Sequence, residues 1–135
     1  MNVKSLVPKD KFDDSNVDKI NELSSEEIAP IIPDLLEWIQ DINWPIASSI
    51  VPILIKHQDI IIQNLINLLQ PEQKDDVWKY WIIVIIIKDL NDQNFHKLLD
   101  TIKRIALNPT DGEKSEEVQL EAIELLKTRN ISLIA

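Results

Sequence analysis

Cysteine is absent from this sequence, and glycine occurs only once. The first absence excludes a disulfide framework and thiolate chemistry, and the second disfavours a glycine-rich loop that cradles phosphate. Basic residues are also scarce, because 14 lysines and arginines stand against 23 acids, for a net charge of −9. This balance argues against a nucleic acid or an anionic membrane as partner, since both require clustered lysine and arginine. The first residues show no apolar core of a signal peptide, so we expect a cytoplasmic protein.

A chain of 135 residues that is 44% hydrophobic and 27% charged is long enough to bury one core. We therefore expect residues 1–135 to form a single all-helical domain. Residues 1–13 are predicted to form an N-terminal arm, because Leu6, Val7, Pro8 and Phe12 are apolar but belong to no helical pattern.

The stretch from Asp76 to Leu90 organises the rest of the chain, because its apolar run from Trp81 to Ile87 is unbroken. The β-branched residues would suit a buried strand, but no partner strand is visible elsewhere. We predict a helix capped by Asp75 or Asp76. Its apolar run is far shorter than the ~20 residues that a membrane span needs, which favours a central core helix. We also expect the arm to cover part of this helix.

Three helical hairpins are predicted around it, each with two antiparallel helices. They cover 30–40 with 44–56, 59–69 with 75–89, and 92–107 with 114–128. A capping box is predicted at Ser24, and Asn43 is predicted to cap the second helix of the first hairpin. Thr110 with Glu113 offers a second capping box, while Gly112 and Ser115 allow a later start of that helix. Pro52 is expected to kink that helix. The fold class is therefore all-α, with about six to eight helices in stacked hairpins; a compact irregular bundle is the alternative architecture.

Several short motifs follow one another along nearly the whole chain. They are Leu6–Asp10, Pro30–Trp38, Asn43–Ala47, Val77–Trp81 and Asn108–Thr110. In this order they resemble a family of small bacterial proteins catalogued as a domain of unknown function, with a HEAT-like helical repeat fold. The resemblance implies the fold, and it brings no catalytic residues. Pro52 departs from the regular second helix that the family fold implies.

Aromatic and polar residues of the first two hairpins form the candidate interaction surface. Its members are Trp38, Asp41, Asn43, Trp44, Trp78 and Tyr80. Aromatic side chains with a polar tip are common at interfaces and pockets. The alternative interpretation is core packing, which is favoured for Trp81 and remains open for Trp44 and Trp78.

The remaining acidic residues and histidines are not assigned to a catalytic or metal-binding site. Asp34, Glu37 and Asp41 share one helical face, which is typical of a solvated surface. His57 and His96 lie in different hairpins without metal-ligand spacing, so neither a metal nor another cofactor is expected. No catalytic residue is proposed.

These observations favour a non-enzymatic protein-interaction module that binds another protein, since helical repeats present extended surfaces. An immunity or antitoxin-type protein that masks a basic partner is one specific form of this hypothesis. The alternative is an enzyme or small-molecule binder with a site in a Trp-lined cleft between the first two hairpins. A helical-repeat nucleic-acid binder is disfavoured by the charge. We expect a monomer rather than a homodimer.

Overall fold

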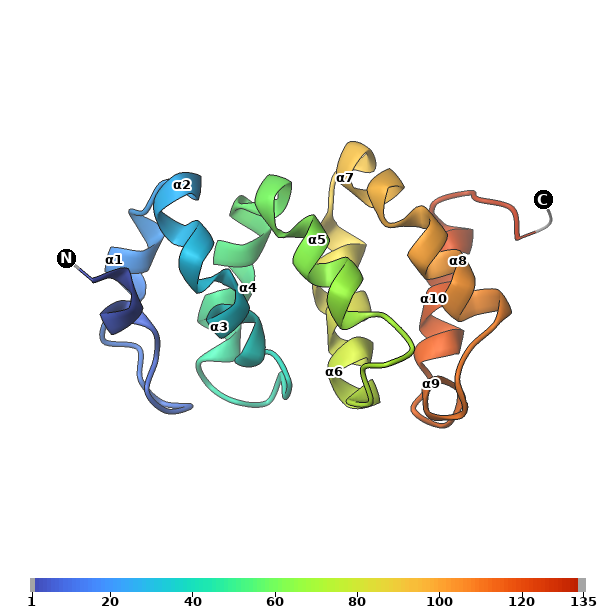
Figure 1. Ribbon diagram of the computed structural model, residues 1–135, viewed down its shortest axis with the longest axis horizontal. Helices are drawn as coiled ribbons and strands as arrows, with labels where there is room; N and C mark the ends of the chain where they lie inside the picture. The colour runs from blue at the N-terminus through green and yellow to red at the C-terminus, as the bar shows by residue number, and fades with distance from the viewer. Residues whose placement is uncertain (1, 134–135) are drawn as a thin grey trace.

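The computed structural model of the chain describes residues 2–133, and all regular secondary structure within that range is helical. The prediction of an all-α fold is therefore confirmed. The helices stand side by side along the long axis of the molecule, with the two ends of the chain at opposite ends of the stack (Figure 1).

The elements are joined by short connections. In chain order they are η1 (Val3–Leu6), α1 (Val17–Asn21), α2 (Ser25–Ile28), η2 (Ala29–Ile31), α3 (Ile32–Glu37), α4 (Ala47–Lys56), α5 (Gln58–Leu68), α6 (Asp76–Trp81), η3 (Ile82–Ile86), η4 (Ile87–Asp89), α7 (Asp92–Lys97), α8 (Leu99–Leu107), α9 (Asp111–Ser115) and α10 (Val118–Thr128).

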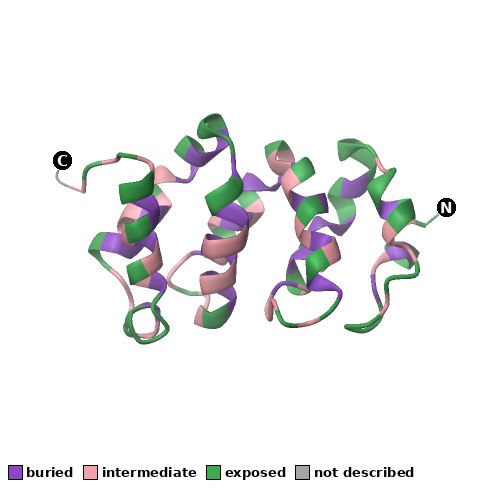
Figure 2. Ribbon diagram, turned by 180° about the vertical axis from the view of Figure 1, so that it is seen from behind, coloured by how far each residue is buried: buried purple, intermediate pink, exposed green. Residues whose placement is uncertain are grey.

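The helices lie in a front row and a back row. In Figure 1, α3, α5 and α8 stand in front, while α4, α6 and α10 stand behind them. Neighbours within the back row contact one another, since α4 and α10 both pack against η3. Buried residues occur in every helix from α1 to α10 (Figure 2), and the buried apolar side chains form one continuous core. Each hairpin therefore buries its apolar stripe against the next.

Several helix starts agree with the local sequence. The Ser24 and Thr110 side chains each accept a hydrogen bond from the backbone N–H three residues later. The Glu27 and Glu113 carboxylates in turn accept from the backbone N–H groups of Ser24 and Thr110, so both capping boxes are confirmed. Asp75 caps α6 in the predicted way by accepting from the Trp78 N–H. These side chains satisfy backbone donors that the first turn of a helix leaves unpaired.

The central stretch is helical, as predicted, but it is not one regular α-helix. The α-helix α6 continues into η3, a π-helical segment, and ends in η4, a 3-10 turn. The Ile87 N–H donates to the carbonyls of Ile82 and Ile83, which marks the wider turn. Widened turns of this kind occur frequently at functional sites.

The predicted Asn43 cap is wrong. Helix α4 begins at Ala47, its preceding residue Ile46 makes no side-chain cap, and the Asn43 N–H instead donates to Asp41 Oδ1 at 2.8 Å. The Asp41 side chain therefore organises a tight turn that delays the helix. Pro52 lies inside α4, which continues to Lys56.

The N-terminal arm does not take the predicted place over the central helix. Its segment η1 contacts η2 and α1 at the N-terminal end of the stack (Figure 1), with Leu6 buried there. The Lys11 carbonyl accepts a hydrogen bond from the Ile46 N–H, and Phe12 remains exposed. The flanks of η3 are covered by α4 and α10 instead.

Candidate functional site

The predicted surface residues do not share one cleft. Trp38 and Trp44 meet edge to face, with ring centroids 5.7 Å apart, and line a hollow beside the arm. Trp78 is 8% exposed and donates its indole N–H to the Leu36 carbonyl at 3.1 Å, so most of it packs in the core. Its remaining surface lines a separate hollow with Pro33 and Glu37. Tyr80 lies on a different surface, against Trp81.

Asp41 and Asn43 have structural roles in the turn before α4, and they line neither the hollow beside the arm nor those beside α10. Trp81 is only partly buried, so core packing describes it incompletely. It lines a surface groove together with Tyr80. The sequence signal for this groove was available in the helical spacing of Val77, Trp81 and Val84, which places all three on one face.

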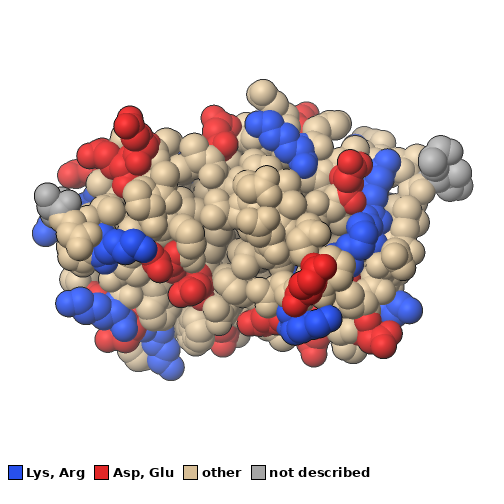
Figure 3. Space-filling view, in the orientation of Figure 1, with Lys and Arg blue, Asp and Glu red and all other residues tan. Residues whose placement is uncertain are grey.

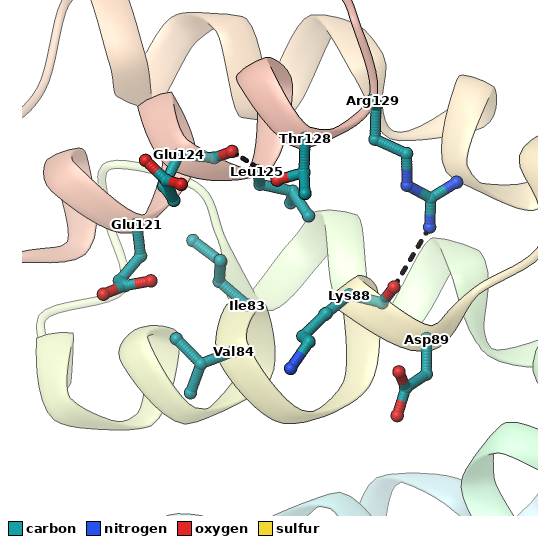
Figure 4. A pocket seen from close by; sticks show the side chains of 9 residues that line it. All are labelled: Ile83, Val84, Lys88, Asp89, Glu121, Glu124, Leu125, Thr128 and Arg129. Carbon is teal, nitrogen blue, oxygen red and sulfur yellow. Dashed lines mark hydrogen bonds between the residues drawn. The ribbon is translucent and has the colours of Figure 1, made fainter.

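Two hollows lie end to end between α6–η3 and α10, and we call them together the α6–α10 groove. The lower hollow, near the start of α6, has a volume of about 320 Å³ and is lined by Val77, Tyr80, Trp81, Ser115, Glu116 and Glu117. The upper hollow has a volume of about 480 Å³ and is lined by Ile83, Val84, Lys88, Asp89, Glu121, Glu124, Leu125, Thr128 and Arg129. Figure 4 shows the upper hollow, with η3 on one side and α10 on the other.

The two walls of the groove differ chemically. The wall from α6–η3 is apolar and aromatic, and its Val77 is 44% exposed. The wall from α10 and the preceding turn is acidic, with members Glu116, Glu117, Glu121 and Glu124. None of these four has an ion-pair partner among residues 2–133. The groove therefore combines apolar surface with uncompensated negative charge.

The upper end of the groove carries charges of both signs, because Asp89 lines it beside Lys88. Arg129 is held there by Asp92 at 2.9 Å and by the Leu90 carbonyl at 2.7 Å. The guanidinium also lies 4.2 Å from the centre of the Phe95 ring. A cation at the last carbonyls of a helix is favourable, so Arg129 closes the end of η4.

Glu117 lies on the acidic wall in a strained conformation. Its φ of 64° is in the left-handed region, which costs a residue with a side chain roughly 1–2 kcal/mol. Asn130 has a similar φ, but there the conformation belongs to an ordinary helix end. Strain of this kind often marks functional sites, and at Glu117 it places a carboxylate beside Val77, Tyr80 and Trp81.

A buried charge cluster connects α6, which forms one wall of the groove, to α9, which precedes the other wall. Lys79 and Glu113 are both 0% exposed, and their Nζ and Oε2 atoms lie 2.9 Å apart. Arg104 donates to both carboxylate oxygens of Glu113 and also to the Leu69 carbonyl, while Lys79 donates to the Gln70 carbonyl at 3.0 Å. The cluster ties α6, α8 and α9 together. Sequence reasoning missed it, because the three residues lie in separate helices and no local pattern pairs them.

The electrostatics of the cluster favour an ionised Glu113. Burial alone would raise the pKa of this carboxyl, but hydrogen bonds from Arg104, Lys79 and the Thr110 N–H outweigh burial and lower its pKa from 4.5 to about 2. Every hydrogen-bond partner of the Glu113 carboxylate is a donor, so these bonds occupy both of its oxygens. The role of the cluster is to hold α6 and α9 in position.

Close packing supports the cluster at Gly112. A Cβ added there would lie 2.0 Å from Asp76 Oδ2, so a larger residue at this position would require the Asp76 side chain to move. Asp76 in turn faces Lys79 at 3.5 Å. The only glycine of the sequence thus serves helix packing.

The opposite face of the molecule offers little comparable chemistry. Figure 3 views the front row, where the centre of the face shows mostly uncharged side chains and the charges gather toward the margins. Helix α5, which crosses this centre, carries Asp59 as its one charged residue. The acidic side chains are therefore unevenly distributed over the surface, and four of them form one wall of the α6–α10 groove.

Within residues 2–133, no group of three or more histidine, cysteine or carboxylate side chains is arranged to hold a metal ion. His57 is buried in the core, where its Nδ1 lies 2.8 Å from Ser25 Oγ, and burial lowers its pKa. No helix in this range is both long enough and apolar enough to traverse a bilayer.

The fold and the groove define a small all-helical protein of stacked hairpins that carries a groove with one apolar and one acidic wall. The chain belongs to the family described as Domain of unknown function (DUF5071), which matches residues 6–126. The matched range includes both walls of the groove up to Leu126 and all of the buried cluster. No curated protein matches the chain.

Proposed function

We propose that this protein is a non-enzymatic protein-interaction module whose α6–α10 groove receives a basic amphipathic segment of another protein. The hairpin stack would serve as a short HEAT-like repeat, an architecture that presents extended surfaces to partners. The observation that carries the proposal is an apolar wall facing a wall of unpaired glutamates.

The chemistry of the two walls specifies both faces of the partner. Apolar side chains would bury Val77, Trp81 and Val84, and lysines or arginines on the adjacent face would pair with Glu117 and Glu121. Apolar burial supplies most of the affinity, while charge complementarity supplies specificity and association rate. A purely basic or a purely apolar segment would satisfy one wall only.

The length and polarity of the groove favour a helix of about three turns. Residues 77–88 span ~16 Å at 1.5 Å per residue. Glu116 and Glu117 make the lower end negative, so the positive N-terminal end of a bound helix belongs there. The basic side chains of the partner then lie toward Glu117. Masking of a basic protein, as an immunity or antitoxin-type protein would do, is one use of such a groove.

A synthetic peptide of about four helical turns, with a leucine stripe beside a lysine stripe, tests the proposal directly. We expect saturable one-to-one binding by isothermal titration calorimetry, weakening as salt rises. Reversing Glu117, Glu121 and Glu124 to lysine should weaken binding at least ~10-fold, because attraction becomes repulsion at three points.

The matched control reverses Glu22, Glu26 and Glu72, which are exposed and lie outside the groove. It changes the net charge equally and should alter the affinity by no more than about twofold. Equal weakening by both triple variants would reduce the effect to net charge and refute the proposal. A scrambled peptide that binds equally well would refute it too, and a proline-interrupted peptide that keeps its affinity would refute the helical form of the ligand.

A further inference from the structure

The hollow beside Trp38 and Trp44 shares no lining residue with the α6–α10 groove. We call it the tryptophan corner; it has a volume of about 270 Å³ and is lined by Val7, Pro8, Asp34, Glu37, Trp38, Gln40 and Trp44. The two indole planes meet at 69°, and both rings are partly exposed. The hollow is therefore lined by two indole rings whose planes are steeply inclined to each other.

The charge around the corner is negative. Glu37 is exposed and has no ion-pair partner among residues 2–133. Asp34 lies within reach of one cation, since Lys4 Nζ is 3.3 Å from its Oδ2. Asp34, one of the lining residues, therefore already pairs with an ammonium group of the chain itself. Indole faces carry negative electrostatic potential and attract cations.

The shape of the corner selects among cations. A planar guanidinium stacks on one ring face at a time, whereas a roughly spherical ammonium head can contact two steeply inclined faces together. Methylated ammonium groups are also weakly hydrated, so they lose little on contact with apolar rings. We propose that the tryptophan corner binds a methylated alkylammonium group, with Trp38 and Trp44 as the contact surfaces and Glu37 as the counter-charge.

Such a group has two sources, a methylated lysine side chain on a protein or a free quaternary ammonium compound. Both present the same head to the corner. The two sources differ in the rest of the molecule, because a peptide continues past Val7 and Pro8 while a small molecule ends there.

Titration followed by NMR of the indole N–H signals tests this inference. Choline should shift the Trp38 and Trp44 signals saturably, with a dissociation constant on the order of 1 mM, while its uncharged isostere 3,3-dimethylbutan-1-ol should not. Trp44→Leu and Glu37→Gln should each weaken choline binding about threefold to fivefold. Lys4→Gln should tighten it, because a competing ammonium is removed.

Glu72→Gln is the matched control, since Glu72 is an exposed acid outside the corner, and it should leave the affinity unchanged. Equal shifts by the uncharged isostere, or equal weakening by Glu72→Gln and Glu37→Gln, would overturn the inference. Because Glu37→Gln alters an exposed side chain, its result does not depend on whether Trp44→Leu folds. A trimethyllysine peptide that binds more tightly than choline identifies a protein source, and equal affinities identify the free compound.

Discussion

Replacing Glu113 with glutamine removes the negative charge at the centre of the buried cluster while preserving the side-chain shape. The carboxylate accepts bonds from Arg104 at both oxygens, from Lys79 at Oε2 and from the Thr110 N–H at Oε1. An amide oxygen can replace only one of these two acceptor positions, and the amide N–H₂ would face donors at the other.

The expected cost depends on the charge that stays buried. Lys79 is fully buried and would keep only the Gln70 carbonyl and Asp76 as partners. Removing one member of a buried ion pair typically costs about 3–5 kcal/mol, because the other charge loses its compensation. We expect this loss for Glu113→Gln at pH 7, measured by urea denaturation followed by circular dichroism.

The pH dependence provides an independent check. The pKa of Glu113 is lowered in the folded protein to about 2 from 4.5, so its stabilising effect is present above pH ~4.5 and is lost as the pH falls toward 2. Linkage gives a loss of roughly 1 kcal/mol for the wild type between pH 7 and 4 that Glu113→Gln does not suffer. The gap between the two proteins should narrow accordingly.

Glu116→Gln makes the same chemical change at an exposed neighbour, and it should alter stability by no more than ~0.5 kcal/mol. The reasoning is refuted if Glu113→Gln is as stable as the control at pH 7. It is equally refuted if the stability gap stays constant between pH 7 and 4, since the gap would then not depend on the ionisation of Glu113.

Two further substitutions test the packing and the strain beside the groove. Gly112→Ala should lower the unfolding free energy by about 1–2 kcal/mol, because the new methyl group meets the Asp76 carboxylate, and a normal melting temperature would show that Asp76 moves aside freely. Glu117→Gly should raise the unfolding free energy by ~0.5–1 kcal/mol by relieving the left-handed conformation, while weakening the binding of the lysine-stripe peptide. Denaturation measures the unfolding free energy of Glu117→Gly and calorimetry measures its peptide affinity. A lower unfolding free energy would contradict this prediction.

Much of the architecture could be predicted from local sequence. The capping boxes at Ser24 and Thr110 and the cap at Asp75 need only residues within one helical turn, so the pattern of side chains was sufficient. The wrong prediction of a cap at Asn43 also has a cause within a few residues. Asn43 is a competent cap, but Asp41 two residues earlier accepts its backbone N–H in a turn.

The candidate site was less predictable. Helical periodicity brings Val77, Trp81 and Val84 onto one face, yet it does not say which neighbour that face meets. Tryptophans in adjacent helices were expected to share a cleft, but Trp78 points inward to the Leu36 carbonyl while Trp38 and Trp44 pair beside the arm. Which side of each helix is covered depends on contacts between hairpins.

The sequence by itself determined the helical class, several helix boundaries and the hairpin order, because these arise from propensity, capping and hydrophobic periodicity over a few residues. Only the tertiary structure decided that Lys79 is buried with Glu113 and Arg104, residues of three separate helices whose charges compensate one another only after α6, α8 and α9 have packed. It also decided that an apolar stripe from one hairpin faces the glutamates of the next. Burial and charge compensation are properties of neighbours in space, and the order of residues along the chain does not specify them locally.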